Sequence, residues 1–353
     1  MTNVNLKSAH AYILMIMSTG FMLHVLILPN ILMAAGRDAW VSVLWSIIPI
    51  VLIGIILYYI SRSLKRESLL TFLHNHYSPP LVKISAAILG LIMFSEAFVT
   101  MKYTLFWTKD NYASEVPNYV IVVSFTLMCC YASFKGVKSI AYLGPLLFLL
   151  VCLFGIFIGV TNTPKKDYSL LFPVFEQGIK PSLKGIIYLC AAFGESLYLL
   201  LLQGDTKRPF SFKGIMLTIF FLLLLTLGPL AAAIAEFGPE EASMMNNPAY
   251  EEWKLLTIGR YITRVDYISI FQWSAGSLIR VSLLVIIANE INGIGRKKWL
   301  LLIIYSLLGI GVLINWQSDQ FFSFLYNIYY PLLSILLLTF LVVSLLLVKL
   351  KSR

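Results

Sequence analysis

Charged residues are scarce in this chain of 353 residues: Asp, Glu, Lys and Arg together make up 12%, whereas hydrophobic residues make up 59% and the mean hydropathy is +0.84. So little charge excludes a soluble globular protein, because too few polar side chains would face water. Cysteine is also scarce, and all four cysteines fall within apolar stretches, at Cys129, Cys130, Cys152 and Cys190. They lack the paired spacing of metal ligands, so the sequence predicts neither a disulfide framework nor a zinc site.

Patterns of catalytic residues are missing as well. The chain has no Walker-type phosphate loop, no dinucleotide fingerprint and no Ser/His/acid constellation. His74 and His76 stand two residues apart, so they would not share one face of a helix. We therefore expect no enzyme activity, no metal and no cofactor.

What the chain has instead is a series of about ten apolar stretches. Most reach the roughly 20 residues that a helix needs to cross the hydrocarbon of a bilayer. The sequence predicts an all-α integral membrane protein with a single membrane domain over residues 1–353. The first stretch is too long for a signal-peptide core, so we expect it to remain in the mature protein. The predicted spans are 10–33, 40–60, 82–107, 117–133, 141–160, 183–202, 212–235, 265–290, 299–314 and 321–348, of which 117–133 and 299–314 are short.

Lysine and arginine indicate the orientation of these spans. With the N-terminus in the cytoplasm, more basic residues fall in inner loops than in outer ones. The positive-inside rule then places both termini in the cytoplasm, as an even number of spans requires. The net charge of +10 is explained by this topology and by anionic lipid headgroups, without any nucleic-acid partner.

Ten spans divide into two sets of five, about 10–160 and about 183–348. An odd number of spans in each set makes the second run opposite to the first, so an inverted repeat is expected. Small and polar residues interrupt the first and sixth spans, at Ser18-Thr19-Gly20 and Gly194-Glu195-Ser196, separated by close to half the chain. Unwound backbone in lipid is tolerated only around a cavity or a ligand. We therefore predict that helices 1 and 6 are broken and that half-helix N-termini bind an anionic group there. The predicted ligand-binding residues are Ser18, Thr19, Gly20, Phe21, Phe193, Gly194, Glu195 and Ser196.

Three ionisable side chains at membrane depth carry the remaining functional hypotheses. Each costs about 2.5–3.5 kcal/mol to insert, so each is expected to face a cavity or a partner. Glu195 is either a ligand or proton site or a structural cap for freed backbone groups. Arg280, near Ser277, either replaces the cation that sodium-driven carriers hold between helices 1 and 8 or pairs with Glu96 or Glu195. Glu96 is likewise either a functional site or a structural partner that holds helices together.

The loop between the seventh and eighth spans, about 236–264, is long and acidic. Within it, Asn247-Pro248 reads as the N-cap and first-turn proline of a short helix. We expect this segment to form an external lid.

Several short motifs follow one another along the chain: Leu28-Pro29-Asn30-Ile31, Ala35-Gly36-Arg37-Asp38-Ala39-Trp40, Phe193-Gly194-Glu195, Asp205-Thr206-Lys207, Arg264-Val265-Asp266 and Trp273. Together they resemble the spore germination permease family. These proteins are the B subunits of the GerA-type nutrient germinant receptors of endospore-forming bacteria, a branch of the amino acid/polyamine/organocation superfamily. Where that family often has a proline near the inner end of span 6, this chain has Leu202-Gln203-Gly204.

The resemblance implies a LeuT-like fold with a 5+5 inverted repeat, located in the spore inner membrane. It implies a complex with an A subunit and a lipoprotein C subunit that senses amino acids or other small nutrients. The germinant would lie at Thr19, Gly20, Gly194 and Glu195. The alternatives are a secondary amino acid transporter, proton-coupled through Glu195 or Glu96, and an assembly protein with a vestigial cavity.

Overall fold

The computed structural model describes residues 6–257, 261, 264–291 and 297–351. Within them the chain is helical, and an isolated bridge between Leu6 and Thr206 is the one β pairing. The α-helices are α1 (Ser8–Phe21), α2 (Leu28–Ala35), α3 (Ala39–Leu64), α4 (Leu69–His76), α5 (Pro79–Asn111), α6 (Asn118–Lys135), α7 (Val137–Thr161), α8 (Lys180–Gly194), α9 (Tyr198–Leu202), α10 (Phe212–Phe237), α11 (Pro239–Met244), α12 (Pro248–Lys254), α13 (Tyr267–Ile291), α14 (Lys298–Leu313), α15 (Ser318–Phe324) and α16 (Tyr330–Lys351).

Short turns of other helical types join these helices. Two are π-helical, η1 (Met22–Ile27) and η7 (Leu325–Tyr329). The others are 3₁₀ turns: η2 (Gly36–Asp38), η3 (Thr163–Lys165), η4 (Tyr168–Leu171), η5 (Glu195–Leu197) and η6 (Gln203–Asp205).

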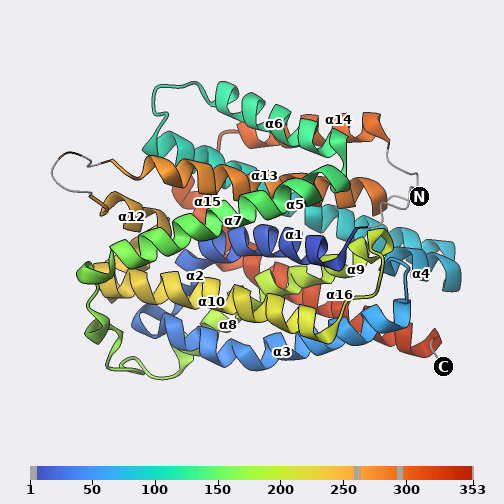
Figure 1. Ribbon diagram of the computed structural model, residues 1–353, viewed down its shortest axis with the longest axis horizontal. Coiled ribbons are helices and arrows are strands. Elements are labelled where there is room, and N and C mark those ends of the chain that lie inside the picture. Colours follow the sequence, from blue (N-terminus) through green and yellow to red (C-terminus); the bar gives the residue numbers. More distant parts are fainter. Residues whose placement is uncertain (1–5, 258–260, 262–263, 292–296, 352–353) are drawn as a thin grey trace.

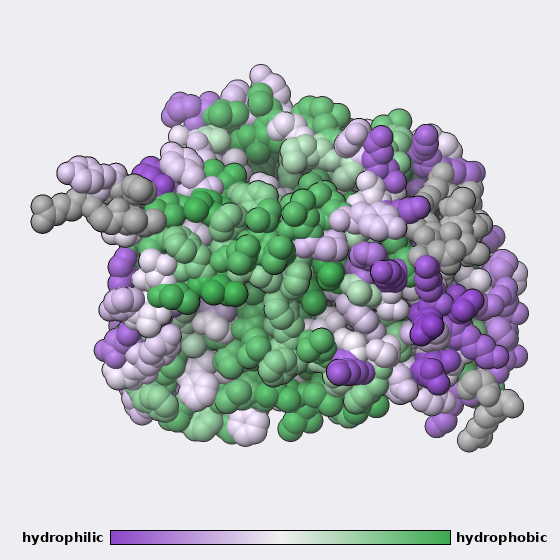
Figure 2. All heavy atoms as spheres, in the orientation of Figure 1, coloured by the Kyte–Doolittle hydropathy of each residue, from purple (hydrophilic) through white to green (hydrophobic). Residues whose placement is uncertain are grey.

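The helices form a bundle whose apolar middle fits a bilayer. In the described residues, eight helical segments are long and apolar enough to cross a membrane, and Lys298–Leu313 is a shorter apolar helix. The first of the eight, Ser8–Leu64, covers both the first and the second predicted span. Figure 2 shows apolar residues over the middle of one face and hydrophilic residues toward its two ends. The integral membrane class is therefore as predicted, whereas the count of ten spans and the two inverted repeats, 10–160 and 183–348, stay predictions.

The start of α1 and the end of α16 lie at the same end of the bundle (Figure 1). Between α2 and α3 the chain reverses at Gly36, whose φ of 53° lies in the left-handed region that favours glycine. At the opposite end lies α12, within the predicted lid (Figure 1). Residues 258–260 and 262–263 of that lid lie outside the described residues.

Two segments occupy the centre of the bundle. Lys180–Asp205 is 83% buried and Tyr267–Ile291 is 72% buried over their most apolar windows, against 11% for Val137–Thr161. The side chains of α7 face outward, as lipid-facing residues do. The most buried segments are therefore those that carry Glu195 and Arg280, and this position withdraws both side chains from lipid.

The expectation that helices 1 and 6 are unwound is wrong. Ser18, Thr19 and Gly20 lie inside α1, and the helix continues as the π-helix η1. In the sixth span, α8 passes through the 3₁₀ turn η5 at Glu195 into α9. Changing from α to π or 3₁₀ geometry keeps the backbone groups hydrogen-bonded, which hydrocarbon requires. No free half-helix ends are therefore presented by these two segments.

Close packing explains both glycines. A Cβ at Gly20 would lie 2.9 Å from Leu225 Cδ2, and a Cβ at Gly194 would lie 2.9 Å from Leu337 Cβ. Gly20 thus lets α1 approach α10, and Gly194 lets α8 approach α16. The sequence predicts unwinding at these small residues. In the structure they are points where two helices pack closely together.

The lid contains the predicted short helix. α12 begins at Pro248, with Asn247 in the N-cap position, although the Asn247 side chain makes no capping hydrogen bond. Tyr103 on α5 donates its hydroxyl hydrogen to the carbonyl oxygen of Asn246 at 2.6 Å. This segment is therefore fastened to the C-terminal half of α5.

Candidate functional site: a buried ion pair between four spans

Arg280 and Glu195 form a bidentate ion pair at the centre of the bundle. Nη1 donates to Oε2 at 2.7 Å, and Nη2 donates to Oε1 at 2.6 Å. The side chains are 1% and 0% exposed, so water does not screen the pair. Two parallel charge-assisted bonds of this length are the strongest geometry that arginine and a carboxylate form. The sequence allowed Arg280 to pair with either Glu96 or Glu195. The bidentate contact in the structure is with Glu195.

The first and third spans complete the coordination of the guanidinium. Nε donates to Thr100 Oγ1 on α5 at 3.0 Å. Nη1 also donates to the Ser18 carbonyl oxygen at 3.2 Å and to Ser18 Oγ at 3.4 Å, and Nη2 donates to Met22 Sδ at 3.5 Å. From α1, Thr19 Oγ1 donates to Glu195 Oε2 at 3.1 Å. The first and sixth spans therefore meet at the predicted residues, although neither is unwound.

A second carboxyl group lies beside this pair. Tyr198, one helical turn after Glu195, donates its hydroxyl hydrogen to Glu96 Oε2 at 2.7 Å. Both side chains are buried, and Glu96 Oε1 has no hydrogen-bond partner among the described residues. Glu96 also interacts electrostatically with Glu195 and Arg280. Lys102, on the same helix, directs its ammonium to the Val312 and Ile314 carbonyl oxygens at 2.8 Å instead.

The described cluster thus holds two carboxyl groups and one guanidinium. If both carboxyl groups are ionised, a negative charge is left uncompensated, which is costly in a dry interior. A proton on either carboxyl group, or one further cation such as an ammonium, would make the cluster neutral. The excess negative charge of the described cluster therefore favours a bound proton or cation.

The other predicted site residues lie around the cluster. Phe21 packs edge-on against Trp273, with ring centroids 5.6 Å apart, and Phe193 is fully buried. Ser196 is buried in η5. The Ser277 hydroxyl donates its hydrogen to the Trp273 carbonyl oxygen of its own helix at 2.8 Å, so this hydrogen is not directed at the Arg280 side chain.

No sequence pattern selects Thr100, Tyr198 or Met22. Thr100 Oγ1 also donates to the Glu96 carbonyl oxygen at 2.7 Å, the ordinary behaviour of a threonine in a helix. Tyrosine is common in any membrane bundle, and Met22 belongs to the π-helix η1. The one available signal was the spacing of Glu96 and Thr100, which puts both on one face of a helix.

Aromatic rings fill the space between the cluster and the lid. Trp107 stacks on Trp273 at 4.0 Å with an interplanar angle of 6°. Tyr250 on α12 packs edge-on against Trp107 at 5.5 Å, and Trp273 donates its indole N–H to Thr104 Oγ1 at 3.1 Å. A continuous set of contacts therefore joins α12 to Phe21, one residue beyond Gly20.

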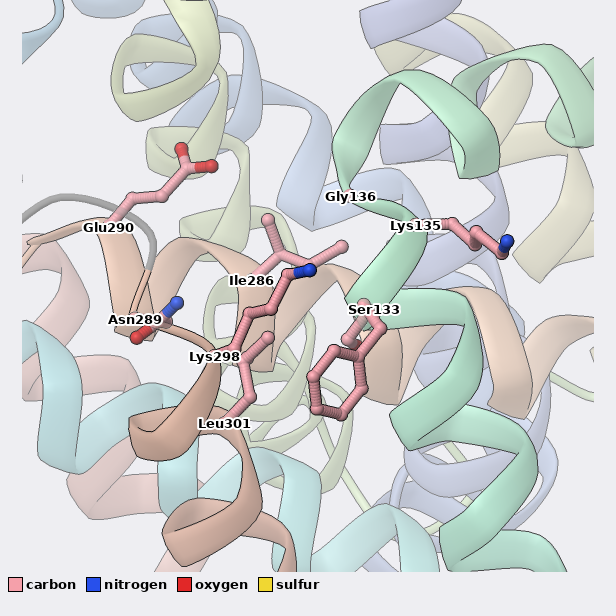
Figure 3. A pocket seen from close by; sticks show the side chains of 9 residues that line it. Ser133, Lys135, Gly136, Ile286, Asn289, Glu290, Lys298 and Leu301 are labelled. Carbon is pink, nitrogen blue, oxygen red and sulfur yellow. The ribbon is translucent and has the colours of Figure 1, made fainter. Parts of the chain in front are cut away.

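Two cavities lie away from the ion pair. One, of about 100 Å³, lies where α6 and α13 end and α14 begins, at the end of the bundle that holds both termini (Figures 1 and 3). The other, of about 190 Å³, lies between α5, α6 and α13 and contains Thr104, Trp107 and Ser274 in its wall. Neither cavity is lined by Glu195 or Arg280. The first is lined by Ser133, Phe134, Lys135, Gly136, Ile286, Asn289, Glu290, Lys298 and Leu301.

An apolar helical bundle with a buried, partly balanced charge cluster defines an integral membrane protein. The chain belongs to the spore germination protein family, whose model matches residues 7–321. It is 34% identical over 343 residues to "Spore germination protein XB" of Bacillus anthracis, an alignment that covers 94% of this chain and 96% of the relative. These matches confirm the family to which the motifs pointed.

Proposed function

We propose that the chain is the membrane subunit of a spore nutrient germinant receptor and that it binds a small amino-acid-like germinant at the Arg280–Glu195 pair to trigger germination. The observation that carries the proposal is the buried bidentate pair between the first, sixth and eighth predicted spans. Family membership supports the role in germination.

The chemistry of the pair favours a zwitterion. An amino acid has a carboxylate that matches the guanidinium of Arg280 and an ammonium that matches Glu195. The ligand would open the internal ion pair and remake each half with one of its own charged ends. Breaking a buried pair costs several kcal/mol unless both charges find new partners. A ligand with only one charged end would therefore bind poorly.

The helical form of the first and sixth spans changes the predicted mode of binding. Half-helix ends are not free to hold the ligand, so side-chain charges do so. Ser18, Thr19 and Glu195 would move apart from Arg280, and Phe21 and Phe193 would contact the side chain of the ligand. Occupancy would favour an arrangement in which these spans are separated, because only that arrangement binds the ligand well. The A and C subunits would respond to this shift in the spore inner membrane, with both termini of this chain in the cytoplasm.

The proposal is tested in spores that carry a variant in place of the native protein. Glu195→Gln keeps the shape of the side chain but removes its charge, so the nutrient concentration for half-maximal germination should rise at least tenfold. Glu251→Gln is the matched control, because Glu251 pairs with Lys254 on the lid surface at 2.8 Å. The protein must be detected in the membrane in both strains. An unchanged dose response for Glu195→Gln overturns the proposed site.

A proton-coupled secondary amino acid transporter is the second candidate, favoured by Glu96. Its buried carboxyl group lies beside the ion pair, as a proton carrier would, and one of its oxygens has no hydrogen-bond partner in the described part of the chain. Purified protein in liposomes distinguishes the two functions. Uptake of labelled amino acid that follows an imposed proton gradient, and is lost in Glu96→Gln, would establish transport. Copurification with two other subunits and no uptake would favour the receptor.

A further inference from the structure

Two further buried carboxyl groups, those of Glu236 and Glu252, lie beside α12, at the opposite end of the bundle from the start of α1. α12 packs there against the end of α10 and the turn after α7. Trp253 and Leu256 form a small apolar core with Ile158 and Val265. Asn162 donates its amide hydrogen to the Glu252 carbonyl oxygen at 2.7 Å. This side of α12 is therefore packed against the rest of the bundle.

Glu236, Glu252 and Lys166 are enclosed between these elements. The ammonium of Lys166 lies 3.4 Å from Glu236 Oε1, with side chains 3% and 0% exposed, and Glu252 is 5% exposed. Among the described residues, both Glu236 oxygens, Glu252 Oε1 and Asn162 Oδ1 have no well-aligned hydrogen bond. Native proteins rarely leave several buried polar oxygens unpaired in one place. A missing hydrogen-bond donor is therefore indicated.

The charged groups that face the pair come from each neighbouring element. Glu236 comes from the end of α10, and Lys166 and Lys165 come from the turn after α7, where Lys165 contacts the Leu255 carbonyl oxygen. On α12 itself, Glu251 and Lys254 pair with each other on the outer face.

Inside the enclosure, two carboxyl groups therefore stand against Lys166. A proton would neutralise the excess charge and supply the missing donor. Burial raises the pKa of the Glu252 carboxyl well above its usual value, nearby Glu236 raises it further, and Lys166 lowers it.

We propose that Glu236 and Glu252 form a proton-binding site that holds the outer lid closed. When Glu252 holds a proton, one carboxylate and one ammonium remain and the enclosure is neutral. When the proton leaves, two buried carboxylates share the Lys166 ammonium, and the uncompensated charge releases α12. Tyr250 packs against Trp107, and the Asn246 carbonyl oxygen accepts a hydrogen bond from Tyr103. Release of α12 therefore also frees the side of the ion-pair site that faces the lid. This site is separate from the germinant site and does not depend on a ligand there.

Amide hydrogen exchange on the full-length protein in nanodiscs tests the proposal. The readout is the protection factor of the peptide 247–256, corrected for the intrinsic pH dependence of exchange. In the wild type, protection should be constant at low pH and then fall about tenfold per pH unit above the apparent pKa of the pair, as release of one proton requires. Glu252→Gln mimics the protonated form, so its protection should not change with pH. Glu251→Gln should follow the wild type. Constant protection in the wild type, or an unchanged slope in Glu252→Gln, overturns the proposal.

Two further measurements keep the proposal testable if Glu252→Gln does not fold. Infrared spectroscopy of the wild type should show a protonated carboxylic acid band that disappears over the pH range in which protection falls, and Glu236→Gln should shift that range. The exchange experiment is also repeated at fixed pH with varied sodium, potassium or calcium. Protection that follows the concentration of one of these ions would mean that a metal cation occupies the pair, and would overturn the assignment to a proton.

Discussion

Loss of either partner of the Arg280–Glu195 pair should destabilise the protein far more than loss of a surface pair. Glu195→Gln removes the charge that accepts two hydrogen bonds at 2.6 and 2.7 Å, while Arg280 keeps its contacts to Thr100 and Ser18. Breaking a buried ion pair by removing one partner costs about 3–5 kcal/mol. Arg280→Gln should cost a similar amount, because Glu195 then keeps the Thr19 hydroxyl as its remaining donor.

The double variant shows whether the pair acts as a unit. Once one partner has been replaced, both bidentate bonds are already lost, so the two costs should not add. We expect a coupling free energy of about 2 kcal/mol or more, in the upper part of the range for residues in contact. Reversible unfolding in mixed micelles, titrated with a denaturing detergent, measures all four free energies. Glu251→Gln, at the exposed pair with Lys254, should cost about 0.5 kcal/mol or less. Single costs below about 1 kcal/mol, or additive costs, would refute the reasoning.

Three further predictions concern the surroundings of the pair. Tyr198→Phe should cost about 1.5–3 kcal/mol of unfolding free energy, because it removes the hydrogen bond to Glu96; a cost near zero would show that the bond is not formed. Gly194→Ala should destabilise by about 1–3 kcal/mol and more than Gly20→Ala, because the added Cβ meets the Cβ of a leucine in the first case and a flexible leucine methyl in the second; equal costs would contradict this. Hydrogen bonds from Arg264, and then its charge, lower the pKa of Asp266, so this carboxylate stabilises the protein above its ordinary pKa, and the stability is lost as pH falls below about 4. Asp266→Asn should therefore flatten the acid side of the thermal-stability profile, and an unchanged profile would exclude the effect.

The membrane class could be predicted from the sequence. Long apolar stretches must satisfy their backbone groups internally, and a helix does so. Pro248 likewise marked the start of α12 correctly, since proline fits the first turn of a helix. The cost of inserting a charge was enough to suggest that Arg280 pairs with a carboxylate.

The local backbone at the site could not be predicted. A Ser-Thr-Gly segment fits an unwound helix or a tightly packed one equally well, and only the neighbouring Leu225 on α10 decides between them. Conversion to the π-helix η1 depends on contacts that are distant in the sequence.

The buried carboxylates of the lid were equally hidden in the sequence. Glu251 and Glu252 are adjacent, and nothing in the sequence distinguishes the exposed one from the buried one. Only the packing of α12 against the end of α10 makes the difference.

Equilibrium binding of tritium-labelled L-amino acids to the purified protein in nanodiscs tests most directly whether a zwitterion opens the Arg280–Glu195 pair. The wild type and Glu251→Gln should bind one member of the panel saturably, and Glu195→Gln should weaken that binding at least tenfold. Unlabelled analogues that lack either the ammonium or the carboxylate should compete at least tenfold less well than the parent amino acid. Equal binding by Glu195→Gln, or equal competition by the deaminated analogue, would contradict the account.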